Sequence, residues 1–390
     1  MSATNTIIQP PPPTNLVATD GDYTNGVQLS WSYSGSETIL RWDIYRYSLG
    51  QAPTFFHSSF STSFTFLDTS ASPTSVYLYA VSAYSYFNGE STLSNEDIGW
   101  VTHSTIGTAA NDVILGNDIA DKIYGYAGND QLYGMGGNDY IDGGDGFDTA
   151  YYKSFLKDAS IVRQPDGSYI IATPLDGTDT LVSVEKFQFA DLAITVTMKA
   201  EAAKLPIATV NSLIELYVAY FIRTPDATGL AYWIDKAAAG EILTDISKEF
   251  YNAGVQYSNL TGYSATMSNT DFIKLVYTNV LDRTGATAPP DADVAYWNKQ
   301  ITTGATTKEG LIQTMLAAAH TFANDPTWGW VPQLLNNKVT VGYQAAVTDG
   351  LDYNSPTDAI TQGMAIAHAV TPTDTSVAVA LIGVGANIHL

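Results

Sequence analysis

A glycine recurs every nine residues in one part of the chain, and an aspartate follows each of these glycines by five places. The five blocks begin at Gly107, Gly116, Gly125, Gly134 and Gly143. Their sixth position is always aspartate, at Asp112, Asp121, Asp130, Asp139 and Asp148, and their eighth position is always apolar. A short fixed period constrains the fold strongly, because every block must adopt nearly the same conformation and stack on its neighbours.

Each block is too short to contain a helix and a loop. The six residues rich in Gly, Asn and Asp tolerate left-handed backbone conformations and form a turn, and the remaining three form a short strand. Two blocks therefore complete one coil, with a turn at each edge. Blocks one, three and five stack on one edge, and blocks two and four stack on the other.

This stacking brings the carboxylates of the sixth position close together. Neighbouring strands lie about 4.8 Å apart, and two carboxylates about 5 Å apart repel by roughly 3 kcal/mol at an effective dielectric constant of about 20. The stack therefore needs a cation. Carboxylate and carbonyl oxygens in flexible loops favour calcium. The alternative is a loop rich in Asn, Gly and Asp that binds no metal.

The blocks resemble the nonapeptide (hemolysin-type) repeats of RTX exoproteins, which form a calcium-loaded parallel β-roll, over residues 107–151. The pattern departs from the family at Ala110 and Ile119, where a fourth-position glycine is expected; Gly146 keeps that glycine. The resemblance implies about three calcium ions between turns on the same edge. The implied ligands are Asp112, Asp121, Asp130, Asp139, Asp148, Gly125, Gly128, Gly134, Gly137, Asn129, Asn138, Asp118 and Asp145.

The segment after the repeats continues in β structure over residues 152–200, with a hairpin turn at 165–167. By resemblance to RTX proteins, residues 179–191 cap the roll by covering its open end. Residues 103–200 are therefore predicted to be one domain, a β-roll with a β cap.

Residues 15–102 alternate apolar and polar side chains in short runs bounded by Gly, Ser, Pro and Asp, which is typical of an antiparallel β-sandwich. Their order resembles a fibronectin type III domain. The matching residues are Leu29 and Trp31 in strand B, Trp42, Ile44 and Tyr45 in strand C, and Tyr77, Tyr79, Val81 and Ala83 in strand F. We expect Trp31 in the core, and the aromatic group Tyr84, Tyr86 and Phe87 indicates an exposed binding loop.

Residues 1–14 form a separate polar arm that contains a stiff polyproline segment, 10–13. The arm has no core of its own and no predicted partner in its own sandwich. We expect residues 4–8 to pair with a strand edge of another copy, which would cover an edge that otherwise promotes aggregation. A disordered arm is the alternative.

Residues 201–338 have apolar side chains at helical spacing and contain two similar copies of a helix, a turn and another helix. The matched pairs are Tyr217 with Tyr277, Arg223 with Arg283, Asp226 with Asp291, Tyr232 with Tyr296 and Trp233 with Trp297. This pattern resembles a helical domain of unknown function that recurs in RTX and surface-layer proteins. We expect Asp226 and Asp291 to be helix N-caps and the two arginines to bond these caps or loop carbonyls, which is a structural role.

Residues 339–390 contain no Lys or Arg and end in SVAVALIGVGANIHL. This tail is similar to the uncleaved C-terminal signal with which RTX exoproteins leave through a one-step type I secretion channel. A final β-hairpin packed on the body is a second interpretation, and it is compatible with the first.

Composition excludes several classes of protein. A net charge of −22 with only 17 Lys and Arg argues against nucleic acid and anionic membranes as partners. The absence of cysteine excludes a disulfide scaffold and a thiol nucleophile. No apolar run reaches 18 residues, so no transmembrane segment is predicted, and the first 15 residues lack the features of a secretory signal.

Catalytic motifs of the enzymes that carry RTX repeats are missing. The five histidines do not form H-E-x-x-H, and no G-x-S-x-G occurs, so neither the proteases nor the lipases are matched. The predicted domains account for most of the chain, whereas a catalytic domain needs about 150 residues. We therefore predict a protein that is not an enzyme, with an unrecognised carboxylate site as a remote alternative.

These observations predict a multidomain chain: a fibronectin III-like β-sandwich, a parallel β-roll and an α-helical domain. We expect an exported, calcium-dependent structural protein of a bacterial cell surface or extracellular matrix. It would be secreted by the type I route, and its partner would be itself, in a lattice (S-layer-like) or a filament. The alternative is a calcium-dependent adhesin or glycan-binding exoprotein, whose partner would be cell-surface polysaccharide.

Overall fold

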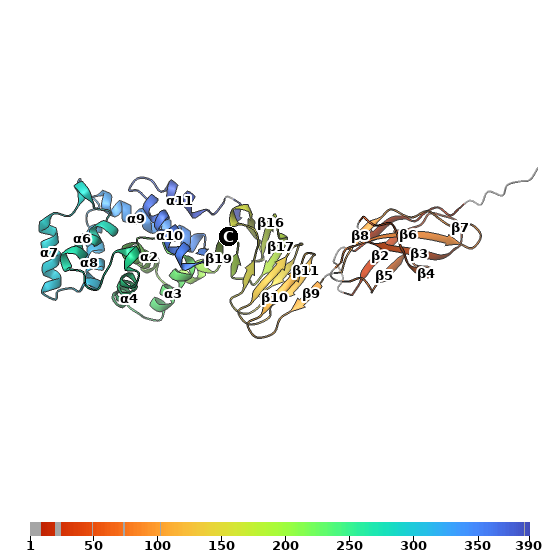
Figure 1. Ribbon diagram of the computed structural model, residues 1–390, viewed down its shortest axis with the longest axis horizontal. Helices are drawn as coiled ribbons and strands as arrows, with labels where there is room; N and C mark the ends of the chain where they lie inside the picture. Colours follow the sequence, from red (N-terminus) through yellow and green to blue (C-terminus); the bar gives the residue numbers. More distant parts are fainter. Residues whose placement is uncertain (1–8, 20–24, 49, 73–74, 102, 386) are drawn as a thin grey trace, which may run out of the picture. The chain divides into compact units, whose positions relative to one another are not determined.

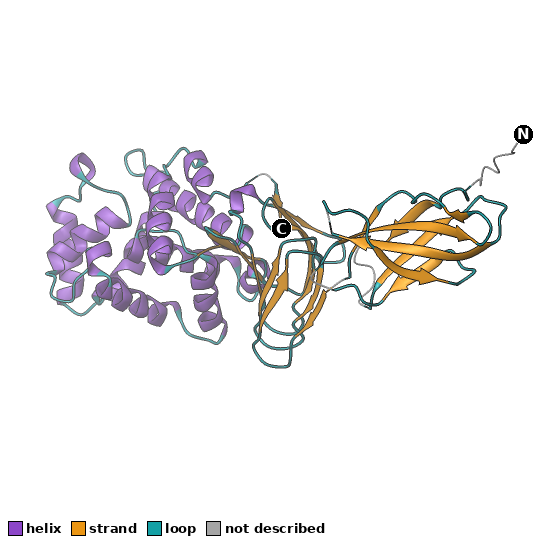
Figure 2. Cartoon of the chain, turned by 45° about the vertical axis from the view of Figure 1, so that its right-hand side comes forward, coloured by secondary structure: helices purple, strands orange, loops and turns teal. Residues whose placement is uncertain are grey.

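The computed structural model describes residues 9–19, 25–48, 50–72, 75–101, 103–385 and 387–390 (Figure 1). The chain divides into two units. The first comprises residues 1–153 and 164–184, and the second comprises residues 154–163 and 185–390. Strands make up most of the first unit and helices most of the second (Figure 2). In the described part of the chain, no helix is both long enough and apolar enough to cross a membrane.

An antiparallel β-sandwich forms the N-terminal part of the first unit, as predicted. One sheet has the order β1-β2-β5, and in the other β3 pairs with β4 and β6, while β7 and β8 both pair with β6. The strands are β1 (Thr14–Ala18), β2 (Val27–Ser32), β3 (Ile39–Tyr47), β4 (Phe55–Ser59), β5 (Thr65–Asp68), β6 (Tyr77–Ser85), β7 (Gly89–Glu90) and β8 (Asp97–Gly99).

The sandwich core is aromatic. Trp31 and Trp42 are 5% and 3% exposed, and their rings meet edge to face at 5.6 Å, so the prediction for Trp31 is confirmed. Tyr86 and Phe87 are 75% and 84% exposed, as expected for a surface loop. The prediction for Tyr84 is wrong, because Tyr84 is half-buried in β6 with Arg41 over its ring.

The N-terminal arm differs from the prediction in its second half. Pro10 and Pro13 are buried, so this half packs against the folded chain instead of extending freely. Thr14 already belongs to β1. The predicted pairing segment, residues 4–8, lies outside the described residues.

The nine-residue blocks form stacked coils of two parallel sheets. One sheet contains β10 (Val113–Asn117), β12 (Gln131–Met135) and β14 (Thr149–Tyr151). The other contains β9 (His103–Ile106), β11 (Asp121–Tyr124), β13 (Tyr140–Asp142) and β17 (Gly177–Val182), with β16 (Tyr169–Thr173) antiparallel to β17. We call residues 103–151 and 174–182 the repeat coil.

The register of the repeat coil places alternate blocks side by side. Ile114 pairs with Leu132 and Leu132 with Ala150 in one sheet, and Ile123 pairs with Ile141 in the other. All five eighth-position side chains are at most 4% exposed. They fill the space between the sheets, so the predicted alternation of blocks between two edges is confirmed.

The second unit contains most of the helices and a few short strands. Its helices are α1 (Met198–Ala202), α2 (Ile207–Phe221), α3 (Ala227–Ala238), α4 (Leu243–Gln256), α5 (Ser258–Thr261), α6 (Asn269–Asn279), α7 (Asp291–Thr302), α8 (Lys308–His320), α9 (Trp330–Tyr343), α10 (Pro356–Ala369) and α11 (Ser376–Ile382). Its strands are β15 (Ser160–Arg163), β18 (Lys186–Gln188), β19 (Leu192–Thr195), β20 (Leu351–Tyr353) and β21 (Ile388–His389).

The two predicted helical copies are present, and each has a third helix. The first copy is α2-α3-α4 and the second is α6-α7-α8. Both turns after the first helix pass through the left-handed region at matching places, with φ of 57° at Ile222 and 51° at Asp282.

The expected helix caps differ between the copies. Asp226 is the N-cap of α3, and its side chain accepts a hydrogen bond from Gly229 N at 2.7 Å, as predicted. The prediction for Asp291 is wrong. Pro290 is the N-cap of α7, and Asp291 is the first residue inside the helix, where its carboxylate makes no cap bond.

The C-terminal segment is mainly helical, so the predicted final β-hairpin is wrong. The boundary expected at residue 339 falls inside α9, and the apolar run near the end forms α11, which stops at Gly383 with φ 76°. Ile366, Ala378 and Ile382 are buried in one apolar cluster with the end of α9. β21 pairs in parallel with β15. Whether this segment is also an export signal stays a prediction.

Candidate metal centre

A ladder of hydrogen bonds links the repeat aspartates along each edge of the coil. On one edge, Asp112 N donates to Asp130 Oδ1 at 2.8 Å, and Asp130 N donates to Asp148 Oδ1 at 2.8 Å. On the other edge, Asp121 N donates to Asp139 Oδ1 at 2.9 Å. Each of these bonds fixes one carboxylate oxygen, so the second oxygen is held in a defined direction.

That second oxygen, Oδ2, points to the first glycine of its own block. A Cβ atom on Gly125 would lie 2.4 Å from Asp130 Oδ2, and one on Gly134 would lie 2.2 Å from Asp139 Oδ2. For this reason no side chain fits at the first position of these two blocks. The constant spacing from glycine to aspartate in the sequence follows from this contact.

Two of these Oδ2 atoms are buried and accept no hydrogen bond from the described residues. Asp130 and Asp139 are 1% and 3% exposed, and among the residues that the structure describes neither Oδ2 has a hydrogen-bond partner. An unsatisfied buried polar atom costs about 1–3 kcal/mol, and more if it is charged. A cation bound at Oδ2 would remove this cost, so the residues present fit a metal ion.

The protonation behaviour of the aspartates leads to the same conclusion. Burial raises the pKa of the Asp139 carboxyl to about 9, and the neighbouring Asp179 carboxylate adds to this shift. Burial also raises the pKa of Asp179, to about 7, and raises the pKa values of Asp121 and Asp148. The charged carboxylates are therefore unfavourable in the folded coil unless positive charge is bound beside them.

The fourth-position glycines are required where one turn lies on another. Gly137 has φ 117°, and a Cβ atom there would lie 2.6 Å from the carbonyl carbon of Ile119 in the turn below; Gly128 has φ 122° and makes the same approach to Ala110. Ala110 and Ile119 belong to the first turn of each edge. The two departures from the repeat pattern therefore occur in the first turns. A glycine of the next turn packs against each of them, at Gly128 and Gly137.

The asparagines at the fifth position hold consecutive turns together. Asn129 Oδ1 accepts a hydrogen bond from Phe147 N at 3.0 Å, and Asn138 Oδ1 accepts one from Thr178 N at 3.0 Å. The structure thus gives their side chains a bridging role between turns.

Asp118 and Asp145, at the third position, are exposed, unlike the sixth-position aspartates. Among the described residues, no three His, Asp or Glu side chains converge on one point. Calcium needs six to eight oxygens. A calcium ion bound here would therefore take most of its ligands from backbone carbonyls of the turns.

A sixth block was missed in the sequence. Residues 174–182 read PLDGTDTLV, which repeats the Gly-x-Asp-x-Leu half of the motif after the intervening residues 152–173. Asp139 N donates to Asp179 Oδ1 at 2.9 Å, and Ile141 pairs with Leu181, as in the earlier blocks. Asp179 is therefore part of the ladder, and residues 179–182 continue the coil instead of covering its end. The spacing of Gly177, Asp179 and Leu181 was the available signal.

A histidine ends the ladder on the same edge at its other end. His103 lies in β9, which pairs with β11 so that His103 stands opposite Asp121. Its Nδ1 is 2.8 Å from Asp121 Oδ1. An imidazole thus occupies the place that an aspartate would take in an earlier block.

Comparison with known families agrees with this geometry. Residues 115–150 match the model of the RTX calcium-binding nonapeptide repeat, with four copies. This segment is an RTX repeat region. RTX nonapeptide repeats bind calcium and are characteristic of secreted proteins. Residues 258–324, which include the second helical copy, match a domain of unknown function (DUF4214). Comparison with curated proteins gave no match.

Similarity to solved structures is partial. An Fn3-like protein from Clostridium thermocellum is 26% identical and covers 24% of this chain and 95% of its own, with a TM-score of 0.21. The extracellular lipase LipA from Serratia marcescens is 19% identical and covers 25% of this chain and 18% of its own, with a TM-score of 0.23. Pectate lyase Pel3 from Pectobacterium carotovorum is 15% identical over 36% of this chain and 60% of its own, with a TM-score of 0.20.

Proposed function

We propose that the chain is an exported structural protein of a bacterial cell surface or matrix, and that its repeat coil is a calcium-loaded parallel β-roll. The buried, uncompensated Oδ2 atoms of Asp130 and Asp139 carry this proposal. They lie beside glycines at which a Cβ atom would come within 2.4 Å of the carboxylate oxygen. Calcium, when bound, supplies positive charge to these oxygens.

The ions would lie between consecutive turns of the same edge. The sequence predicted about three such intervals. The sixth block adds one between the turns of Asp139 and Asp179, whose ladder bond of 2.9 Å matches that between Asp121 and Asp139. Four calcium ions are therefore our proposal for the loaded coil, with carboxylates and turn carbonyls as ligands.

Calcium would couple folding to export. Where calcium is scarce, the raised pKa values of Asp139 and Asp179 show that their ionised carboxylates disfavour the folded coil. Where calcium is abundant, binding to the folded state alone stabilises it, by about 2.7 kcal/mol when calcium is about 100-fold above its dissociation constant. A coil that folds only after type I secretion follows from this difference.

The non-enzymatic part of the proposal rests on the kind of modules present. RTX repeats and domains of the matched helical type are typically non-catalytic.

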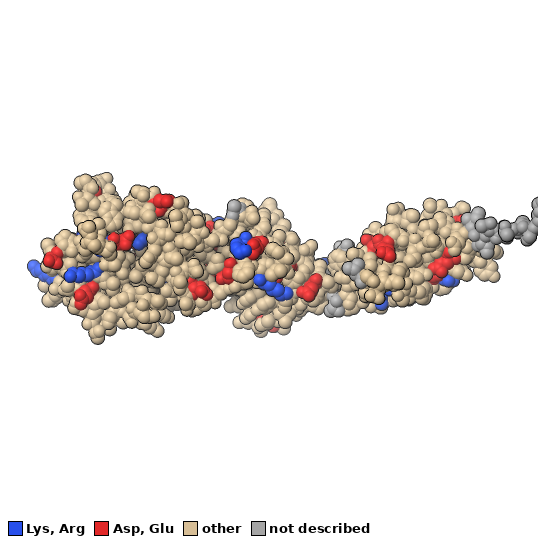
Figure 3. Space-filling view, turned by 45° about the horizontal axis from the view of Figure 1, so that its top comes forward, with Lys and Arg blue, Asp and Glu red and all other residues tan. Residues whose placement is uncertain are grey.

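The surface supports the assembly part of the proposal. The strand order of the sandwich supports the fibronectin III-like assignment. The sandwich exposes Tyr86 and Phe87 beside each other, with ring centroids 5.2 Å apart. On the face drawn in Figure 3, charged side chains are sparse and separated by wide neutral areas. Such a surface suits contact with other copies.

Electron microscopy of the purified protein, with millimolar calcium and with chelator, tests the assembly. Lattices or filaments that form with calcium and disperse with chelator support it. Single particles under both conditions would contradict assembly and would favour the alternative, a calcium-dependent adhesin.

Deleting residues 1–14 tests whether the N-terminal arm connects the copies. If the truncated protein forms the same assemblies, the arm is not the connecting segment.

A further inference from the structure

A cavity of about 470 Å³ lies in the second helical copy, among α6, α7, α8 and the start of α9. This volume falls within the range of about 300–1,000 Å³ typical of small-molecule sites. Five aromatic side chains contribute to its lining: Tyr277, Tyr296, Trp297, Phe322 and Trp328. Tyr296 and Phe322 are 56% and 40% exposed, so part of this aromatic surface is open to a ligand from solvent.

A buried guanidinium also lines the cavity. Arg283 is only 7% exposed, and its charged group lies 3.8 Å from the Trp328 ring centroid and 4.9 Å from that of Tyr277. Its Nε donates to Thr287 O at 2.9 Å. Its Nη2, however, is buried and donates to no acceptor in the described part of the protein. Leaving a buried charged donor unpaired is costly, so this atom indicates an acceptor that the chain does not provide.

The matched arginine of the first helical copy has a carboxylate partner. There, Arg223 Nη1 donates to Asp226 Oδ2 at 2.8 Å, and Asp226 is also the cap of α3. In the second copy the cap is Pro290, which has no side-chain acceptor. The arginine is present in both copies, but in the described part of the chain only that of the second copy has a buried Nη2 without an acceptor.

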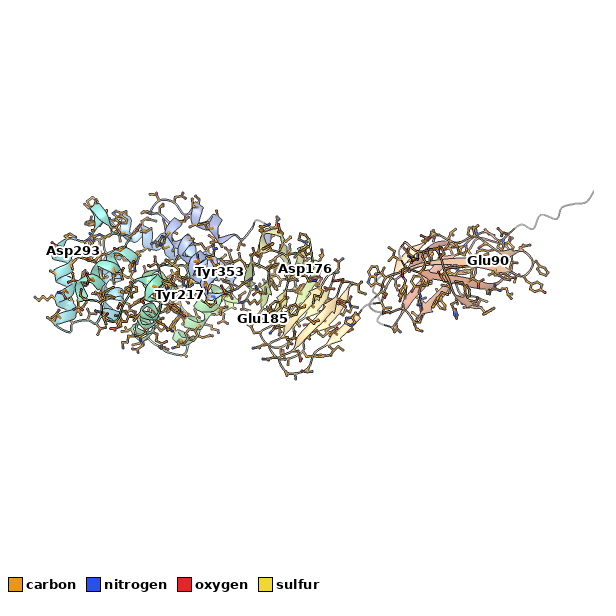
Figure 4. The ribbon with its side chains drawn as sticks, in the orientation of Figure 1. Glu90, Asp176, Glu185, Tyr217, Asp293 and Tyr353 are labelled. Carbon is orange, nitrogen blue, oxygen red and sulfur yellow. The ribbon has the colours of Figure 1, made fainter. Side chains whose placement is uncertain are left out.

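Carboxylates complete the polar part of the cavity. Asp293 lies in the first turn of α7 (Figure 4), and Asp325 Oδ1 accepts hydrogen bonds from Thr327 N and Trp328 N at 2.8 Å each. Both residues line the cavity. A ligand there meets aromatic faces, one donor with a positive charge and two groups that only accept when ionised.

We propose that this cavity binds a neutral saccharide. A pyranose ring has an apolar C–H face that stacks on indole and phenol rings, and its hydroxyls both accept from Arg283 Nη2 and donate to the two carboxylates. A cationic ligand is disfavoured because Arg283 already places its charge on Trp328 and Tyr277. A polyanion is opposed by Asp293, Asp325 and the net charge of −22. The site goes beyond the proposed calcium function, and its occupancy does not depend on assembly.

Binding is tested on the full chain in calcium by calorimetry and saturation-transfer NMR. The probes are methyl β-glucoside, methyl β-galactoside, methyl N-acetyl-β-glucosaminide and their β-linked trisaccharides. We expect at least one probe to bind. Arg283→Met should weaken this binding by about tenfold or more, as expected for a hydrogen bond to a charged group. Tyr296→Ala, at an exposed position, should also weaken it.

The first copy provides matched controls, Arg223→Met and Tyr232→Ala, and Tyr232 is exposed to a similar degree, at 53%. Both controls should leave saccharide affinity unchanged, with circular dichroism confirming that every variant is folded. The proposal is overturned if no probe binds, if the controls weaken binding as much as the cavity variants, or if sodium acetate competes with the sugar. None of these results bears on calcium binding by the repeat coil, so a failure here leaves that proposal standing.

Discussion

Replacing Asp139 by asparagine should change the stability of the repeat coil in opposite directions with and without calcium. Asp139 is shared by two proposed intervals on its edge, because its Oδ1 accepts a hydrogen bond from Asp121 N and its own N donates to Asp179 Oδ1. Asparagine keeps an oxygen for the first bond and leaves the backbone bond intact. The substitution therefore removes mainly the negative charge and one oxygen ligand.

The magnitude follows from the shifted pKa. Without calcium, burial raises the pKa of Asp139 to about 9, from 3.8 for an ordinary aspartate. The free energy of unfolding therefore falls as the pH rises from about 4 to 7, which is about three pH units. Each unit is worth about 1.4 kcal/mol, so the loss at pH 7 is roughly 4 kcal/mol at most. The buried amide nitrogen that replaces Oδ2 costs about 1–3 kcal/mol because it too lacks a partner. In chelator, Asp139→Asn should therefore stabilise the coil by about 1–3 kcal/mol.

In calcium the sign reverses, because the variant loses a charged ligand in both intervals. Each tenfold loss of calcium affinity removes about 1.4 kcal/mol of stabilisation. Denaturant unfolding followed by circular dichroism, in chelator and in millimolar calcium, measures both values. Asp158→Asn is the control, because it removes only an exposed charge outside the repeat coil and should be neutral in both conditions. Destabilisation by Asp139→Asn in both conditions, or stabilisation in both, would refute the reasoning.

Three further predictions concern the same coil. Gly137→Ala should destabilise it by at least about 1 kcal/mol more than Gly167→Ala, by thermal unfolding in calcium, because both have positive φ but only Gly137 also meets a neighbouring turn; equal losses would show that the contact is unimportant. In chelator, coil stability should fall as the pH rises from about 4 to about 9, since the folded state holds protons on Asp139 and Asp179 that the unfolded state has lost; in calcium this fall should disappear, and a fall of the same size with calcium present would contradict the bound cation. Asp179→Asn should lower the calcium stoichiometry by one in calorimetry, and an unchanged stoichiometry would remove the sixth block from the site.

The coil was predictable because its chemistry is periodic. Every ninth residue must be glycine where Oδ2 of the aspartate approaches its Cα, as at Gly134, and this requirement is visible in the sequence. The sixth block was not recognised in the sequence, because residues 152–173 interrupt the nine-residue period and because its first position is proline. A search for a fixed nine-residue spacing in the sequence cannot find this block. Its alignment with the earlier blocks is evident only in the structure, where Ile141 pairs with Leu181.

The helical unit was less predictable in its details. The apolar run 376–382 alternates residues compatible with either a strand or a helix, and packing of Ala378 and Ile382 against the end of α9 decides for the helix. The cap at Asp291 was inferred by analogy with Asp226, although the adjacent Pro290 takes the cap position. The cap of α7 therefore offers Arg283 no carboxylate like the one that Arg223 bonds, and nothing in the local sequence of Arg283 indicates its unpaired Nη2.

A crystal structure of the protein grown in millimolar calcium, with anomalous diffraction, tests the central claim most directly. The account predicts calcium peaks between same-edge turns, about 2.3–2.6 Å from carboxylate oxygens that include Asp130 Oδ2 and Asp139 Oδ2. A well-ordered coil with water or no density at these two oxygens, and no anomalous signal between the turns, would contradict it.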